Sequence, residues 1–158
     1  MIDDLTFDVI VIGGGHAGCE AAAASARMGV NTGLFTHKIE TIGEMSCNPA
    51  IGGLGKGHLV KEIDALDGVM GVVADKSAIQ YRLLNRSRGP AVRGPRTQSD
   101  RALYKKHMQE LLLSYSNLEI FSDPVIEFIF RENNVIGIHT KSGKKINCKK
   151  MILTTGTF

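Results

Sequence analysis

Near its N-terminus the chain reads Phe7-Asp8-Val9-Ile10-Val11-Ile12-Gly13-Gly14-Gly15-His16-Ala17-Gly18. The apolar run over residues 7–12 predicts a buried strand, and the alanine-rich stretch from Gly15 to Met28 predicts a helix. The glycines between them have the spacing of a dinucleotide-binding loop, in which a strand leads through a tight turn into a helix. The stretch therefore predicts an α/β fold with a parallel sheet. The alternative is a glycine-rich connection that binds nothing.

Three glycines of this loop have distinct expected roles. Gly13 permits the turn, Gly15 lets the backbone approach a phosphate, and Gly18 lets the helix pack closely on the strand. Backbone N–H groups and the positive end of the helix dipole then face one point, which suits a pyrophosphate. The predicted contact residues of the loop are Gly13, Gly14, Gly15, His16, Ala17 and Gly18.

The composition is that of an ordinary soluble globular protein. Of the 158 residues, 43% are hydrophobic and 22% are charged, and we find no apolar run long enough to span a membrane. Cys19, Cys47 and Cys148 are scattered and form neither a metal-ligand spacing nor an obvious disulfide framework. The acidic N-terminus has no secretory signal. We therefore expect a cytoplasmic protein with no metal site and no membrane association.

The sequence that follows the loop predicts the second strand of a βαβ unit and then a long insertion. Val30–Thr36 is the predicted strand, and Thr41–Gly57 is glycine-rich and loop-like. Apolar residues recur at helical spacing over Lys56–Leu66, which predicts a helix. Ile79–Leu84 is ambiguous between strand and helix. We expect an inserted segment at about residues 40–98.

The last third of the chain predicts one helix and then a change to a period of two. Ser99 is the expected N-cap of a helix over Asp100–Tyr115. A strand over Leu118–Phe121 follows, and the pattern then indicates an antiparallel meander and a return strand. These later strands are predicted at Val125–Arg131, Val135–Thr140, Lys145–Cys148 and Met151–Thr155.

This order of elements resembles a Rossmann-like FAD-binding domain of the glutathione-reductase type, a parallel sheet with a β-meander. In such domains the adenine lies near the segment after the fourth strand, which is here Pro124-Val125-Ile126. The sequence stops soon after the last predicted strand. We therefore expect residues 1–158 to be the N-terminal part of the FAD-binding domain of a longer protein, truncated at the C-terminal end.

One position departs from the dinucleotide-binding pattern. An acid about 20 residues beyond the glycines usually binds the ribose hydroxyls. The chain has Phe35-Thr36-His37 at that place, and the nearest acid is Glu40. We expect Thr36 or His37 to hydrogen-bond the ribose instead.

Arginines concentrate between Tyr81 and Arg101. This segment has six arginines and one acid, Asp100, whereas the net charge of the whole chain is only +3. A local excess of positive charge indicates a polyanionic partner. The alternative is a solvated basic loop.

A longer motif extends from Ser46 to Gly68 and reads SCNPAIGGLGKGHLVKEIDALDG. Together with Gly13–Gly18, Gly89–Arg93 and Thr154–Phe158, it closely resembles the family of tRNA uridine 5-carboxymethylaminomethyl modification enzymes, also called glucose-inhibited division protein A. The resemblance implies an FAD enzyme that uses NADH as reductant. With a GTPase partner, such an enzyme modifies C5 of the wobble uridine of tRNA. Methylenetetrahydrofolate is the implied one-carbon donor, and a homodimer is the implied assembly.

The resemblance also implies roles for individual residues. Gly13–Gly18 would form the FAD phosphate loop, and Val125 would contact the adenine. Arg93 and Arg96 are candidates to bind tRNA phosphates or a folate carboxylate. The remaining candidate contacts to FAD are Asn48, Gly52, Gly53 and Gly156. The NADH site is expected beyond Phe158.

Cys47 is the candidate catalytic residue. C5 of uracil is a poor nucleophile, and addition of a thiolate at C6 makes it enolate-like. Cys47 lies in a glycine-rich turn before a predicted helix, a place where protein thiols are often activated. The alternative is a small residue packed against the flavin, without covalent chemistry.

Two other functions remain open at this point. One is a different FAD-dependent oxidoreductase or a folate-dependent tRNA uracil methyltransferase, although the motif at Ser46–Gly57 argues against both. The other is a chain that is inactive as isolated, because walls of the flavin site are expected to come from residues that it lacks.

Overall fold

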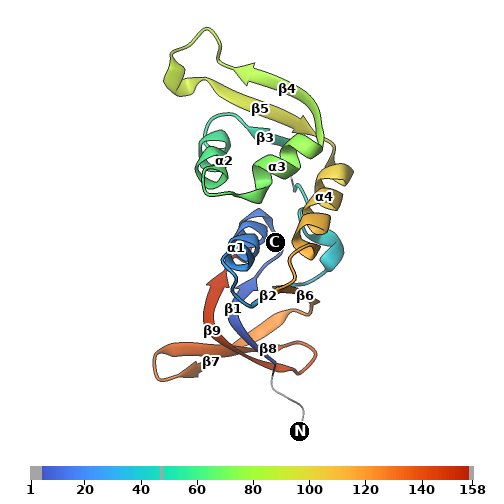
Figure 1. Ribbon diagram of the computed structural model, residues 1–158, viewed down its shortest axis with the longest axis vertical. Helices are drawn as coiled ribbons and strands as arrows, with labels where there is room; N and C mark the ends of the chain where they lie inside the picture. Colours follow the sequence, from blue (N-terminus) through green and yellow to red (C-terminus); the bar gives the residue numbers. More distant parts are fainter. Residues whose placement is uncertain (1–4, 47, 157–158) are drawn as a thin grey trace. The chain divides into compact units, whose positions relative to one another are not determined.

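The computed structural model describes residues 5–46 and 48–156. The chain divides into two compact units (Figure 1). The first unit comprises residues 1–42 and 111–158, and the second unit comprises residues 43–110. The long helix α4 (Arg101–Leu113) begins in the second unit and ends in the first.

The first unit is built on a six-stranded sheet with the order β6-β2-β1-β9-β8-β7. Four of these strands are parallel neighbours: β6 (Leu118–Ser122), β2 (Thr32–Thr36), β1 (Thr6–Ile12) and β9 (Lys145–Leu153). The antiparallel strands β8 (Asn134–Thr140) and β7 (Val125–Arg131) continue the sheet beyond β9. The predicted α/β class, with a parallel sheet and a β-meander, is confirmed.

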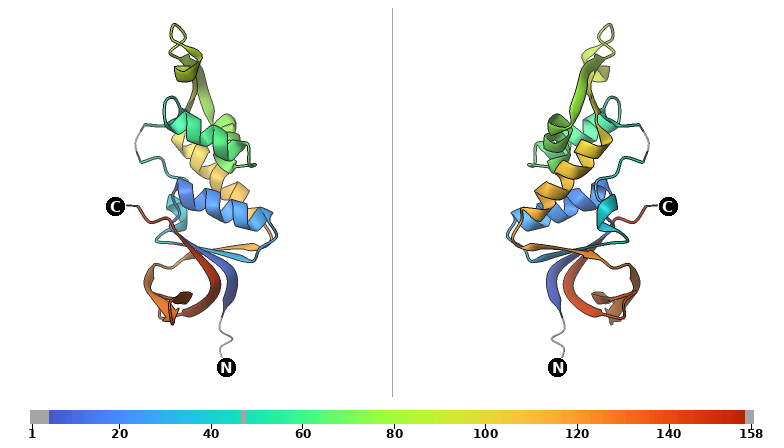
Figure 2. Two further views of the ribbon diagram at one scale, coloured as in Figure 1. Left: turned by 90° about the vertical axis from the view of Figure 1, so that its left-hand side faces the viewer. Right: turned by 90° about the vertical axis from the view of Figure 1, so that its right-hand side faces the viewer.

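Helix α1 (His16–Arg27) connects β1 to β2 and covers one face of the parallel strands (Figure 2). Its buried side is made of small residues, which allow the helix to lie close to the sheet: Gly18, Cys19, Ala22, Ala23 and Ala26. The helix ends in a Schellman motif. Gly29, at φ 79°, donates to the carbonyl of Ala26, and the N–H of Val30 donates to the carbonyl of Ser25.

The other face of the parallel strands carries the aromatic core, and β7 and β8 curl beneath it (Figure 2). Phe35 and Phe121 stack at a centroid distance of 4.6 Å, and Phe7 meets both rings edge-on. Ile138 and Ile146, from the meander, belong to the same buried cluster. This cluster joins β1, β2 and β9, and so it holds the ends of these three strands in place relative to one another.

β9 differs from the prediction, which placed two strands at Lys145–Cys148 and Met151–Thr155. A single strand of nine residues spans Lys145–Leu153. Its first residues pair with β8 in antiparallel fashion, and from Asn147 onward it pairs with β1 in parallel. The polar residues Lys149 and Lys150 interrupt the apolar pattern without interrupting the strand, because pairing with β1 continues through them. Lys149 also forms an ion pair with Asp8 at 2.6 Å.

The second unit has a three-stranded antiparallel sheet with the order β3-β5-β4 and two helices. β4 and β5 form a long hairpin (Figure 1). The bounds are β3 (Ala50–Gly52), α2 (Lys56–Asp64), α3 (Val69–Lys76), β4 (Ala78–Leu84) and β5 (Gly94–Ser99). Short 3-10 turns, η1 (Ile39–Thr41) in the first unit and η2 (Pro90–Val92) in the second, complete the chain.

Several local predictions for the second unit were incomplete. Gly94-Pro95 is a turn signal that favours a loop, yet residues 94–99 form β5, in which Pro95 lies at the second position. Helix α3 was not predicted, and Asp100, rather than Ser99, caps α4 by accepting a bond from the N–H of Leu103 at 2.9 Å.

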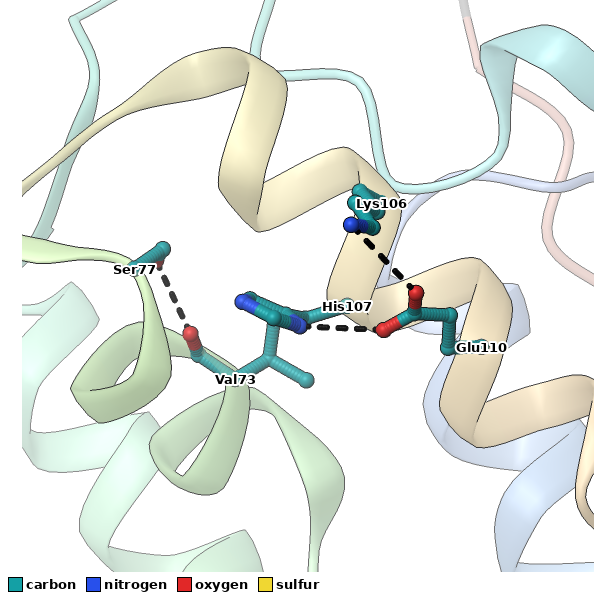
Figure 3. A network of polar contacts seen from close by, with 5 residues as sticks. All are labelled: Val73, Ser77, Lys106, His107 and Glu110. Carbon is teal, nitrogen blue, oxygen red and sulfur yellow. Dashed lines mark hydrogen bonds and ion pairs between the residues drawn. The ribbon is translucent and has the colours of Figure 1, made fainter.

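Figure 3 shows polar contacts at the end of α3 and along α4. The buried Ser77 ends α3 and donates from Oγ to the carbonyl of Val73 at 2.8 Å. On α4, Glu110 forms an ion pair with Lys106 at 3.8 Å and pairs with Nδ1 of His107 at 3.1 Å. These are contacts between near neighbours on a helix, so we assign His107 a structural role.

Candidate functional site

A pocket of about 310 Å³ lies in the first unit, where β1, β2 and β9 end and α1 begins. Carboxyl ends of parallel strands form the usual ligand edge of such sheets. The start of β7 closes one side. The predicted residues that line this pocket are Gly13, Gly14, Gly15, His16, Ala17, Thr36, His37, Val125 and Gly156.

Gly13 and Gly18 are required by the geometry of the loop. Gly13 has φ +112°, and a Cβ on it would lie 2.8 Å from the carbonyl oxygen of Thr154. A Cβ on Gly18 would overlap the carbonyl oxygen of Gly13. Gly18 does not line the pocket, but it lets α1 start directly against the turn.

Gly15 differs from both, because a Cβ on it would meet no protein atom within 4 Å. It is the N-cap of α1, and the first helical bond runs from the N–H of Cys19 to its carbonyl at 2.9 Å. The N–H groups of residues 16–18 therefore point toward the end of the helix, as in any first turn. Open space at Gly15 lies where a diphosphate would reach these groups.

Thr36 and His37 lie at the end of β2, where the family of dinucleotide sites usually has an acid. Thr36 is buried, and its Oγ1 would lie 2.8 Å from a Cβ on Gly14. His37 is exposed, and its carbonyl accepts a hydrogen bond from Oγ of Ser122 at 3.2 Å. No acidic residue is among the described residues that line the pocket.

The wall formed by Pro124 and Val125 is held by a clamp of hydrogen bonds. The carboxylate of Asp123 accepts bonds from the N–H and the hydroxyl of Ser142, and the N–H of Lys141 donates to the carbonyl of Pro124 at 2.8 Å. Burial alone would raise the pKa of Asp123, but the hydrogen bonds, those from Ser142 above all, lower it below its usual value. The clamp thus favours an ionised Asp123.

Thr154 braces the glycine loop and was not singled out as a site residue. Its Oγ1 donates to the carbonyl of Ile12 at 2.9 Å and lies 3.3 Å from that of Gly13, and its N–H also donates to Ile12. A signal was present in the sequence, since a polar residue directly follows an apolar parallel strand. Such residues meet the glycine loop at the same sheet edge.

A second pocket, of about 300 Å³, lies within the second unit. The predicted residues Asn48, Gly52, Gly53 and Arg96 line it, together with Lys56. Arg93 does not. It lies exposed in the β4–β5 connection, where its Nε donates to the carbonyl of Arg88 at 2.9 Å.

Cys47 lies outside the described residues, so its predicted role stays a prediction. Within residues 5–46 and 48–156, no group of three or more His, Cys, Asp or Glu side chains is placed to hold a metal ion. In the same part of the chain, no helix has the length and hydropathy needed to cross a membrane.

Comparisons with known proteins agree with this geometry. Two crystal forms of GidA from Aquifex aeolicus match with 47% and 48% identity and TM-scores of 0.94 and 0.93. They cover 100% and 97% of this chain, and the chain spans 26% of each Aquifex protein. A GidA-related protein from Thermus thermophilus shares the fold, at 18% identity and a TM-score of 0.61, over 96% of this chain and 54% of that one.

The match therefore includes the strand–glycine–helix site, the second unit and the strand that returns to Thr154. A family model described as glucose inhibited division protein A covers residues 8–158. The chain thus belongs to the glucose inhibited division protein A family.

Proposed function

We propose that this chain binds FAD and forms part of a tRNA-modifying enzyme. The observation that carries the proposal is the pocket of about 310 Å³ at the glycine loop, whose lining combines that loop with Thr36, His37 and Val125. The family to which the chain belongs supports the identity of the cofactor.

The residues of the first unit fit the adenosine diphosphate half of FAD. The N–H groups at the start of α1 suit the diphosphate, and the missing side chain of Gly15 leaves room for it. Thr36 and His37 offer polar atoms to the ribose, while Pro124 and Val125 offer an apolar wall to the adenine. When bound, FAD supplies electron transfer, and the protein supplies placement and electrostatics.

In the second unit, Asn48, Gly52 and Gly53 are proposed to contact the flavin ring. Gly52 and Gly53 line the pocket of the second unit with φ values of 123° and 83°, and neither has a side chain that would keep a flat ring away. Cys47, directly before Asn48 in the sequence, is proposed as the thiolate that adds to C6 of uracil and activates C5.

The finer activity follows from the resemblance of the motifs. The enzyme would install the carboxymethylaminomethyl group on the wobble uridine, with NADH as reductant and methylenetetrahydrofolate as one-carbon donor. A GTPase partner, a homodimeric assembly and a cytoplasmic location complete the proposal. Because the chain spans 26% of its Aquifex relatives, we expect it not to turn over by itself.

Arg93 and Arg96 are proposed to bind tRNA phosphates. Arg96 pairs directly with Arg82 across the β4–β5 hairpin, and like charges placed directly opposite each other destabilise a sheet. A phosphate between or beside them would relieve that repulsion.

The experiment that tests FAD binding is Gly15→Ala, with Gly89→Ala as its matched control. Neither Cβ meets a protein atom within 4 Å, and neither glycine has a positive φ. Both variants are therefore expected to keep the melting temperature of the parent chain. Gly15→Ala should lower the affinity for FAD by at least about tenfold. Its methyl group would occupy the space of the diphosphate, and charge-assisted hydrogen bonds to the diphosphate would be lost.

FAD affinity is measured by titration of flavin fluorescence. Equal affinity in Gly15→Ala and Gly89→Ala would place the cofactor elsewhere and contradict the proposal. The catalytic role of Cys47 has a separate test, since a Cys47→Ser variant of the complete enzyme should lose tRNA modification while it keeps FAD.

A further inference from the structure

We propose that the second unit holds a binding site for a small oxyanion, a phosphate or carboxylate group, between Lys56 and Arg96. Both side chains line the pocket of about 300 Å³ described above. The site is distinct from the glycine loop of the first unit. It rests on the anion-binding role proposed above for Arg96 and deepens it by adding Lys56 and the walls of this pocket, and its detection requires no flavin.

Two different elements bring the cations to this pocket. Lys56 is the first residue of α2, and its Nζ donates to the carbonyl of Ala50 at 3.2 Å, which leaves further N–H donors on the ammonium group. Arg96 lies on β5 directly opposite Gly52 of β3 and is half-buried. A Cβ on Gly52 would lie 2.7 Å from Cα of Arg96, so glycine is required here for β3 to lie this close to the backbone of β5.

The charge of the pocket is not balanced by protein groups. No acidic residue is among the described residues that line it, and the ion pairs found within residues 5–46 and 48–156 include neither Lys56 nor Arg96. Two cations that share a partly buried cavity repel each other, and an anion removes that cost. A guanidinium offers the paired donors that match two oxygens of a phosphate or carboxylate.

The remaining walls indicate what is attached to the anionic group. Leu54 and Leu84 are apolar, and Asn48 presents an amide that both donates and accepts hydrogen bonds. A pocket whose lining includes two cations and two leucines suits a small molecule that carries one anionic group on an organic body. A phosphodiester of RNA carries the same chemistry and is the other source.

The test is titration of the intact chain with inorganic phosphate and with acetate, followed by amide chemical shifts. We expect shifts at residues 52–56, separate from those at the glycine loop. Lys56→Gln and Arg96→Gln should each weaken the response at residues 52–56 by about tenfold, and Arg96→Lys should retain part of it. The matched control is Arg88→Gln, which removes an arginine of the same hairpin outside the pocket.

An unchanged response in both variants, or an equal loss in Arg88→Gln, would overturn the site. If Arg96→Gln does not fold, Lys56→Gln still decides, because Lys56 is exposed at the start of α2. Gly15→Ala should leave the response intact, so failure of FAD binding and failure of this site are distinguishable.

The source of the oxyanion is identified by competition with tRNA. An RNA phosphodiester is the ligand if two results are obtained. First, tRNA removes the phosphate response at residues 52–56. Second, phosphate displaces tRNA from the parent chain but not from Arg96→Gln. If tRNA leaves that response unchanged, the site takes a small molecule. Both results support an oxyanion site, and the absence of any shift at residues 52–56 with phosphate and acetate contradicts it.

Discussion

Strand β1 of the first unit and helix α2 of the second unit bury their apolar residues to very different extents. In the first unit, β1 places Phe7, Ile10 and Val11 at 1% exposure or less. In the second unit, Gly57 is the buried residue of α2, while Leu59 and Leu66 of the same segment are 63% and 78% exposed. The apolar pattern therefore predicted both the position and the burial of β1. In α2 the pattern predicted the helix correctly, but these two leucines are exposed and not buried.

The largest expected effect is a difference in stability between a core position and an exposed one. Ile10→Ala should lower the free energy of unfolding by about 2–5 kcal/mol, because it leaves a cavity at a fully buried position of β1. Leu59→Ala should change it by less than about 0.5 kcal/mol. Denaturant unfolding of both variants measures the difference, and equal losses would show that Leu59 is covered.

A second, smaller effect is expected at Thr154, which braces the glycine loop of the first unit. Thr154→Val keeps the shape of the side chain but removes the donor to the carbonyls of Ile12 and Gly13. We expect a loss of about 1 kcal/mol of stability and weaker FAD binding. The matched change Thr41→Val removes only a local bond to Lys38 and should leave FAD binding unchanged.

Protection of backbone amides from hydrogen exchange should also differ between the strands of the first unit and α2. Amides of β1 and β2 are expected to exchange with solvent far more slowly than those of α2, because buried sheet hydrogen bonds open only with larger unfolding. Hydrogen exchange read residue by residue checks this. Equal protection in α2 and β1 would contradict the comparison.

The smallest expected effect is a dependence on pH. In the folded chain the pKa of Asp123 is lowered, so its contribution to stability is present above the usual carboxyl pKa and is lost as the pH falls through the lower, folded value. Asp123→Asn should therefore flatten the acid side of the stability curve. An unchanged curve would show that the clamp at Ser142 does not favour the ionised carboxylate.

The sequence predicted the first unit well because its signals are local and agree with one another. The strand, the glycines and the helix between Phe7 and Met28 stand in the order that the structure shows, and Gly29 ends the helix as its conformation requires. The break expected within β9 was wrong, since pairing with β1 continues through Lys149 and Lys150.

The second unit could be predicted less well because its elements depend on distant partners. β3 has only three residues and exists through pairing with β5, and β5 exists through pairing with β4. Turn signals at Gly94-Pro95 concealed that pairing. For the same reason the meeting of Arg96 with Lys56 and Asn48 in one pocket was not visible in the sequence.

The central claim is that the glycine loop of the first unit holds the diphosphate of FAD. The most direct measurement is the position of that diphosphate in a crystal structure of the chain with FAD bound. We expect phosphate oxygens within hydrogen-bonding distance of the N–H groups at the start of α1, beside Gly15. Bound FAD whose diphosphate lies away from this loop would contradict it.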